Sequence, residues 1–121
     1  MAVRMYQLTV DSHDLPAQAR FWSRVLDWRI LFESGDEIVI GADALALPGM
    51  CFIAVPEGKT VKNRLHIDLT PDDQAAEVER ILALGARRID VGQGADATWV
   101  TLADPEGNEF CVLRAKTSLT D

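Results

Sequence analysis

The chain has 121 residues, a length that predicts a single domain with its own hydrophobic core. Its formal charge is −7 with no run of basic residues, which argues against nucleic-acid binding. Neither a long apolar run nor a signal-peptide pattern is present, so we expect no membrane span and a cytoplasmic location. Cys51 and Cys111 each lie in an apolar run, as expected of buried, reduced thiols.

The first half of the chain predicts one strand, one helix and three further strands. Residues 4–10 have the pattern of a strand. The helix should begin near Pro16, because a residue before proline is pushed out of helical geometry, and it should end near Asp27. Short strands are expected at 29–33, 37–40 and 50–55. The apolar face of the helix consists of Leu15, Ala19, Phe21, Trp22, Val25 and Leu26.

The second half predicts the same order again. After a strand over 63–69, Thr70 should cap a helix that has Pro71 in its first turn and Asp73 at the third position. Gly85 is the expected end of that helix. Its predicted buried stripe consists of Ala75, Val78, Ile81 and Leu82. Three strands should follow, at 87–91, 98–103 and 109–113.

The repeated order predicts an α+β fold made of two tandem βαβββ units within one domain, residues 1–121. Unit one covers about residues 1–58 and unit two about residues 59–121, with a polar linker near the boundary. Alternation of helices and strands alone would also fit a ferredoxin-like α+β sandwich. The three strands after each helix favour the tandem βαβββ arrangement.

Strand alternation predicts which side chains share a pocket. Arg64, His66 and Asp68 should lie on the face opposite the apolar residues of their strand. Glu109 and Cys111 share one face of the last strand, and Cys51 and Ile53 share one face of the strand over 50–55. The predicted ligand-binding set is therefore Arg64, His66, Glu109 and Cys111, floored by Ile53 and Cys51.

Three of these residues have more than one interpretation. His66 fits a general acid or base, a ligand contact, or a hydrogen-bonded histidine of a strand. Cys111 fits a nucleophile activated by His66, or an inert core thiol. Arg64 fits a clamp for an anion, or a solvated residue next to the linker.

The segment Asp104-Pro105-Glu106-Gly107 is typical of a type I turn that joins the last two strands. With Phe21-Trp22 and the segment 62–69, this hairpin resembles the glyoxalase/bleomycin-resistance/dioxygenase (vicinal oxygen chelate) superfamily, and most of all its small bacterial glyoxalase-like proteins. The resemblance implies that both units curl into a cupped mixed sheet around a cavity. It also implies metal ligands on four strands, of which only His66 is kept, because the other positions fall at residues 5–7, Ile53 and Cys111.

Two functions from different classes follow from the resemblance. The first is the binding of a small organic molecule, anionic if Arg64 contacts it, in a metal-free cavity without a cofactor. The alternative is a metal-dependent lyase, isomerase or dioxygenase with a rearranged site at His66, Glu109 and Cys111. The sequence does not decide whether the protein is an enzyme. We also expect a homodimer, because a monomer this small leaves strand edges and apolar surface uncovered.

Overall fold

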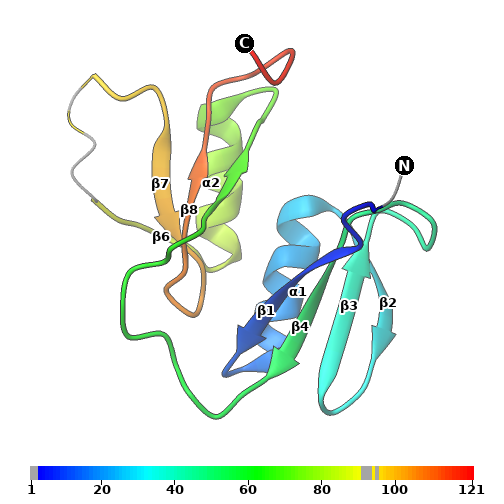
Figure 1. Ribbon diagram of the computed structural model, residues 1–121. Helices are drawn as coiled ribbons and strands as arrows, with labels where there is room; N and C mark the ends of the chain where they lie inside the picture. The colour runs from blue at the N-terminus through cyan, green and yellow to red at the C-terminus, as the bar shows by residue number, and fades with distance from the viewer. Residues whose placement is uncertain (1–2, 91–93, 95) are drawn as a thin grey trace. The chain divides into compact units, whose positions relative to one another are not determined.

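Both halves of the chain fold with one strand, one helix and three further strands, in that order. The computed structural model describes residues 3–90, 94 and 96–121. Contacts divide the chain after Gly58 into two compact units, and Figure 1 gives the labels of their elements. The predicted α+β class with tandem βαβββ units is confirmed.

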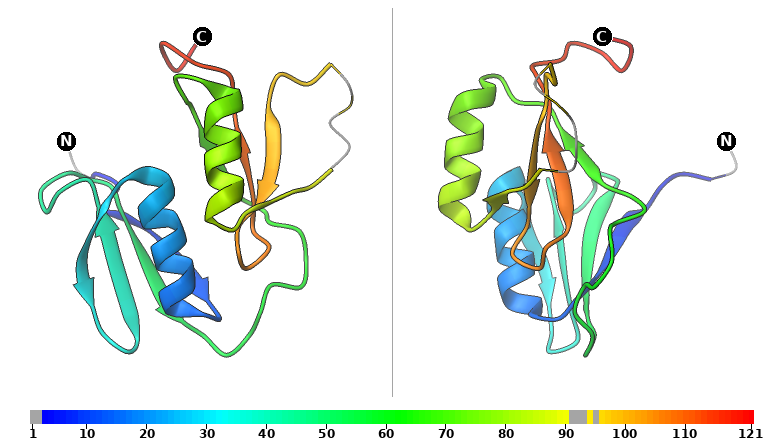
Figure 2. Two further views of the ribbon diagram at one scale, coloured as in Figure 1. Left: turned by 180° about the vertical axis from the view of Figure 1, so that it is seen from behind. Right: turned by 90° about the vertical axis from the view of Figure 1, so that its left-hand side faces the viewer.

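The first unit is a four-stranded mixed sheet with one helix on it. Its elements are β1 (Gln7–Ser12), α1 (Leu15–Leu26), β2 (Arg29–Glu33), β3 (Glu37–Gly41) and β4 (Gly49–Ala54). The strand order is β1-β4-β3-β2, in which only the β1–β4 pair is parallel. Helix α1 packs against β3 and β4, and Figure 2 shows it along one face of the sheet. The core of this unit lies between that face and the helix.

The second unit repeats this topology with shorter strands. Its elements are β5 (Ile67–Leu69), α2 (Gln74–Leu84), β6 (Arg87–Arg88), β7 (Val100–Ala103) and β8 (Glu109–Val112). The strand order β5-β8-β7-β6 is the same permutation as in the first unit, again with one parallel pair, β5–β8. Helix α2 packs against β8. Of the helices in the described residues, neither is long and apolar enough to cross a membrane.

Local sequence signals place both ends of α1. The Asp14 side chain caps the helix by accepting a hydrogen bond from the backbone N–H of Ala17 at 3.3 Å. Asp27 ends it in the left-handed conformation, with φ 54°. The rings of Phe21 and Trp22 are buried and meet edge to face, with centroids 5.3 Å apart. Gln18 is also buried, although the apolar pattern did not include it.

The start of α2 differs from the prediction. Asp73, rather than Thr70, caps the helix, and its side chain accepts a hydrogen bond from the backbone N–H of Ala76 at 3.1 Å. The Thr70 hydroxyl instead accepts a hydrogen bond from the backbone N–H of Lys116 at 2.9 Å. The later start leaves Ala75 exposed, whereas Val78 and Ile81 are buried as predicted. Gly85 ends the helix as expected, with φ 124°.

Several strands are shorter or shifted relative to the sequence pattern. The predicted strand over 63–69 pairs with β8 only over Ile67–Leu69, and Arg64 and Leu65 lie in a bend before it. Leu65 consequently lies outside the sheet and is 79% exposed. The first strand lies at Gln7–Ser12 rather than 4–10. The prediction of a strand to Val91 extends beyond β6 into residues 91–93, which lie outside the described residues.

The turn between β7 and β8 is organised by one buried carboxylate. Asp104 is 2% exposed, and its Oδ1 accepts hydrogen bonds from the backbone N–H groups of Glu106 and Asn108 at 2.9 and 3.0 Å. Its Oδ2 accepts a third from the Asn108 side chain at 3.1 Å. The Gly107 N–H closes the turn on the Asp104 carbonyl at 2.8 Å, and Gly107 adopts φ 88°. This turn positions the start of β8.

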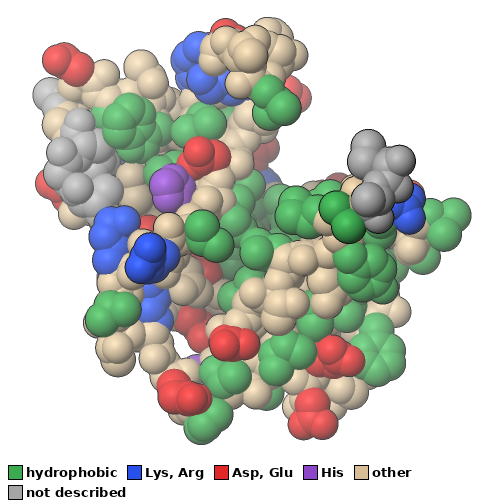
Figure 3. All heavy atoms as spheres, in the orientation of Figure 1, with side chains coloured by type: hydrophobic (Ala, Val, Ile, Leu, Met, Phe, Trp, Pro, Cys, Tyr) green, Lys and Arg blue, Asp and Glu red, His purple; other side chains and the backbone are tan. Residues whose placement is uncertain are grey.

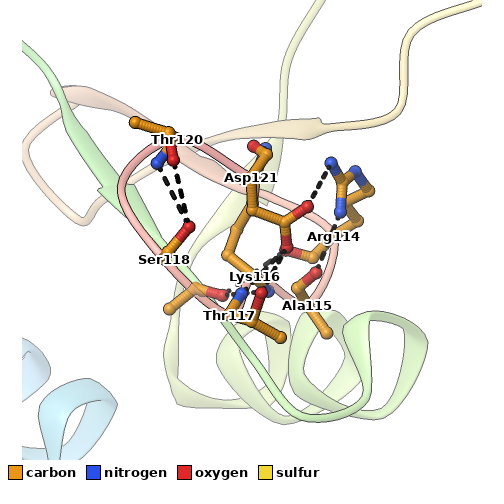
Figure 4. Close-up of polar contacts among 8 residues, drawn as sticks. Arg114, Ala115, Lys116, Thr117, Ser118, Thr120 and Asp121 are labelled. Carbon is orange, nitrogen blue, oxygen red and sulfur yellow. Dashed lines mark hydrogen bonds and ion pairs between the residues drawn. The ribbon is translucent and has the colours of Figure 1, made fainter.

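The segment after β8 folds back around a carboxylate. The Asp121 side chain accepts hydrogen bonds from the backbone N–H and the hydroxyl of Thr117 at 2.9 and 3.2 Å, and Arg114 forms an ion pair with it (Figure 4). The backbone N–H of Thr117 and the Arg114 guanidinium lower the pKa of Asp121. These contacts order the chain beyond the last strand.

Candidate ligand-binding site

One face of the second unit's sheet carries a pocket of about 320 Å³, within the size range of small-molecule sites. Its lining mixes charged, polar and apolar side chains. Figure 3 shows, on this unit, an exposed histidine with acidic and basic side chains beside it. The lining residues are Lys62, His66, Asp68, Trp99, Thr101, Glu109, Cys111 and Leu113.

Strand register brings the middle of this pocket together. Cys111 in β8 lies between Asp68 in β5 and Thr101 in β7, because these three residues are direct cross-strand partners. Alternation sends the neighbouring side chains of Phe110 and Val112 to the opposite face, where both are 1% exposed. Phe110 and Val112 therefore lie on the core face of the last strand, opposite Glu109 and Cys111, as alternation predicts.

Three metal-binding side-chain types meet at this point. The Nε2 atom of His66 lies 3.2 Å from Oδ1 of Asp68, and both side chains are half exposed. One ligand atom each from His66, Asp68 and Cys111 lies within 4.8 Å of the others. The Cys111 sulfur also lies 3.6 Å from the Thr101 hydroxyl. Imidazole, carboxylate and thiol are the ligands that zinc sites use, so this cluster fits a divalent ion chemically.

Glu109 lies in the pocket wall but is engaged by its own partner. Its Oε2 lies 3.2 Å from the Lys59 ammonium, in an ion pair that is mostly shielded from solvent. Burial alone would raise the pKa of Glu109, but hydrogen bonds from its own backbone N–H and from Lys59 outweigh burial and lower it. Glu109 is therefore held in an ion pair with Lys59, and it does not belong to the cluster of His66, Asp68 and Cys111.

The structure distributes the predicted site residues unevenly. His66, Glu109 and Cys111 line the same pocket. Arg64 is exposed at a bend before β5 and is absent from the pocket lining, where Lys62 is the cation. Cys51 and Ile53 belong to β4 of the first unit.

Five pocket residues lay outside the predicted set, and one of them, Leu113, shares its strand face with Glu109 and Cys111 by alternation. Asp68 was placed on the correct face by alternation, and Trp99 was visible as an aromatic residue that precedes a strand. Thr101 could have been found from its alternation with the buried Leu102. No pattern in the sequence marked Lys62 over Lys59 or Arg64, because all three precede the ordered part of β5.

The first unit carries different chemistry at the corresponding positions. Cys51 in β4 lies between Thr9 in β1 and Val39 in β3, just as Cys111 lies between Asp68 and Thr101. Thr9 precedes the helix cap Asp14 by the same spacing as Asp68 precedes the cap Asp73, so Cys51, which pairs with Thr9, corresponds to Cys111, which pairs with Asp68. By the same register Gln7 corresponds to His66, so an amide and a hydroxyl replace the imidazole and the carboxylate.

Both thiols are protonated more firmly than an exposed cysteine. Burial raises the pKa of Cys111, and the hydrogen bond from Thr101 offsets this only in part. Burial also raises the pKa of Cys51, whose sulfur donates a hydrogen bond to the Glu37 carboxylate at 3.4 Å. Because the thiolate is the reactive form, the geometry does not indicate an activated nucleophile at either position.

We expect Cys111 and Cys51 to react slowly with iodoacetamide at pH 8, at least about tenfold more slowly than an unhindered thiol. Their raised pKa values leave less thiolate at this pH, so the alkylation rate should keep rising above the ordinary thiol pKa of about 8.5. Mass spectrometry can follow each site. The control is Leu119→Cys, since Leu119 is fully exposed. Equal rates at Cys111 and at the thiol introduced by this substitution would contradict the prediction.

Comparison with known proteins places this geometry in context. The glyoxalase-like domain family matches residues 7–113, from the start of β1 to just beyond β8. A comparison with curated proteins gave no match.

Solved structures with the same fold include proteins of different activities. A glyoxalase/bleomycin resistance protein/dioxygenase family enzyme from Burkholderia phytofirmans PsJN is 18% identical with a TM-score of 0.72, covering 94% of this chain and 100% of that one. A variant of the fosfomycin resistance protein FosX from Listeria monocytogenes, complexed with Mn(II) and 1S,2S-dihydroxypropylphosphonic acid, is 16% identical with a TM-score of 0.73, covering 96% and 92%. A bleomycin-binding protein complexed with bleomycin is 18% identical with a TM-score of 0.61, covering 95% and 100%. At these identities the likeness shows a shared fold.

Proposed function

This chain belongs to the glyoxalase-like domain family, and from that premise we propose that it binds a small organic molecule in the pocket of its second unit, without a bound metal. The observation that carries the proposal is the pocket itself, in which apolar and polar side chains converge on one face of the sheet. The bleomycin-binding protein of the same fold supports a binding role.

The small number of donors available favours binding without a metal. Within the described residues, His66, Asp68 and Cys111 form the one group of potential ligands, and the first unit has Gln7 and Thr9 at two corresponding positions. Glu109 is already held by Lys59.

The direct test is native mass spectrometry of protein purified under gentle conditions, followed by identification of any bound compound after denaturation. The expected result is a small organic ligand that Cys111→Trp, which fills the pocket, no longer retains. Retention of the ligand by a folded Cys111→Trp variant would place binding outside this pocket.

We expect protein purified without chelator to contain far less than one equivalent of Zn, Ni, Mn or Fe per chain. The reason is the absence of matching donors at the paired positions of the first unit and the engagement of Glu109 by Lys59. Elemental analysis by plasma mass spectrometry checks this. A metal-to-chain ratio near one that His66→Ala abolishes would contradict it.

The second candidate function is metal-dependent lyase, isomerase or dioxygenase chemistry. It is favoured by the convergence of His66, Asp68 and Cys111 within 4.8 Å, and by the Mn(II) complex of FosX. In that case these three side chains would hold the ion, in place of the predicted set of His66, Glu109 and Cys111. The ion would act as a Lewis acid toward a substrate oxygen. The metal content of the purified protein separates the two functions.

We further propose that the protein is a homodimer. Several large apolar side chains of the first unit are exposed, including Ile30 at 46% and Phe32 at 51% in the edge strand β2. Exposed apolar edges of this kind are commonly covered by a second copy. Light scattering at micromolar concentration should give twice the 13.3 kDa chain mass. A mass of 13.3 kDa alone would contradict the proposal.

A cytoplasmic location is the remaining proposal. Cys51 and Cys111 are both free and buried in the structure. Free thiols that form no disulfide are typical of reducing compartments.

A further inference from the structure

The pocket of the second unit has two chemically different ends. The pair Val100–Val112 leaves Trp99 and Leu113 at the same end of β7 and β8. The pair Ile67–Phe110 leaves His66 and Glu109 at the opposite end. From residue 113 to residue 109 the strand advances by roughly 13 Å, so one elongated small molecule can contact both ends.

A lysine without a carboxylate partner lies next to the polar end, since the side chain of the neighbouring Asn63 donates a hydrogen bond to the Glu109 carbonyl at 3.3 Å. Glu109 is compensated by Lys59, and Asp68 lies beside His66. Lys62 also lines the pocket, and in the part of the chain that the structure describes it forms no ion pair. An ammonium group at the wall of a partly apolar pocket attracts an anion.

The other end offers a flat apolar surface. Trp99 is 38% exposed although it is a large aromatic residue, and it shares the pocket wall with the half-buried Leu113. A partly exposed indole next to an aliphatic side chain offers apolar area for the packing of a second ring. Between the two ends lie Cys111 and Thr101, which are too small to fill the space.

We propose that this pocket binds an aromatic carboxylate, with the ring on Trp99 and Leu113 and the carboxylate paired with Lys62. A linker of a few carbons between ring and carboxylate matches the separation of the two ends. This inference rests on the proposed small-molecule function and names the chemical class of the ligand.

The test uses three probes of similar size, 3-phenylpropanoate, its neutral amide, and hexanoate, which lacks the ring. NMR titration of the full chain should give a dissociation constant for 3-phenylpropanoate about tenfold lower than for either of the others, since each lacks one of the two contacts. Lys62→Met and Trp99→Leu should each raise this constant about tenfold. The matched controls Lys116→Met and Trp28→Leu, outside the pocket lining, should leave it unchanged.

Two outcomes overturn the inference. One is equal affinity for the acid, the amide and hexanoate. The other is unchanged affinity of Lys62→Met together with loss of affinity in Arg64→Met, which would assign the anion to the residue predicted from sequence alone. Circular dichroism of each variant confirms that a loss of affinity is not a loss of folding.

A parallel screen of chemically diverse fragments separates failure of this inference from failure of the proposed function. If fragments of another class shift the NMR signals of the Trp99 indole and the His66 ring, the pocket binds small molecules but aromatic carboxylates are not its ligand class. If no fragment shifts either signal, both the proposed function and this inference are wrong.

Discussion

Replacing Phe110 with alanine is expected to lower the free energy of unfolding by about 3–5 kcal/mol, as for other fully buried aromatic residues. Phe110 is 1% exposed in the central strand β8, with Ile67 and Leu102 as its cross-strand partners. Helix α2 packs against the same strand. Truncation would leave a cavity between sheet and helix that the neighbouring strands cannot close. Urea denaturation followed by circular dichroism measures the effect.

The matched control is the adjacent residue on the other face of the same strand. Cys111→Ala removes a small side chain that borders the pocket, so we expect a loss below about 1.5 kcal/mol. Similar losses for the two variants would show that β8 does not separate core from pocket as described.

Replacing Asp104 with alanine is expected to destabilise the protein by about 3 kcal/mol. The buried carboxylate accepts hydrogen bonds from two backbone N–H groups and from the Asn108 side chain, and all three donors would lose their partner. A hydrogen bond to a charged group contributes about 1.5–3 kcal/mol, and an orphaned buried donor adds a desolvation cost. The unfolding midpoint in urea should fall accordingly.

Pro105→Ala provides the control for Asp104→Ala within the same turn. Pro105 is exposed and contributes mainly by restricting the unfolded chain, so its loss should cost no more than about 1 kcal/mol. Asp104→Asn keeps the shape and one acceptor oxygen and should fall between the two. If Asp104→Ala were as stable as Pro105→Ala, the carboxylate would not organise the turn.

Much of the fold could be predicted from the sequence because local chemistry decides it. The spacing of apolar residues predicts the repeat of one strand, one helix and three strands. The two helices end at Asp27 and Gly85, as their sequence indicates. The hairpin follows from the Asp-Pro-Glu-Gly turn. Alternation in β8 alone places Glu109 and Cys111 on the pocket face. These are properties of a few consecutive residues.

Tertiary structure decided the features that depend on pairing between segments far apart in the sequence. Strand β5 pairs with β8 only from Ile67 onward, with Arg64 at an exposed bend before it and Lys62 in the pocket lining. The cap of α2 is Asp73, whereas the Thr70 hydroxyl accepts a hydrogen bond from the backbone N–H of Lys116, 46 residues away. The same holds for Asp68, which joins His66 and Cys111 only because the register of β5 on β8 pairs it with Cys111. Composition and periodicity carry no information about register between strands so far apart in the chain, since that register is set by the packing of the whole sheet.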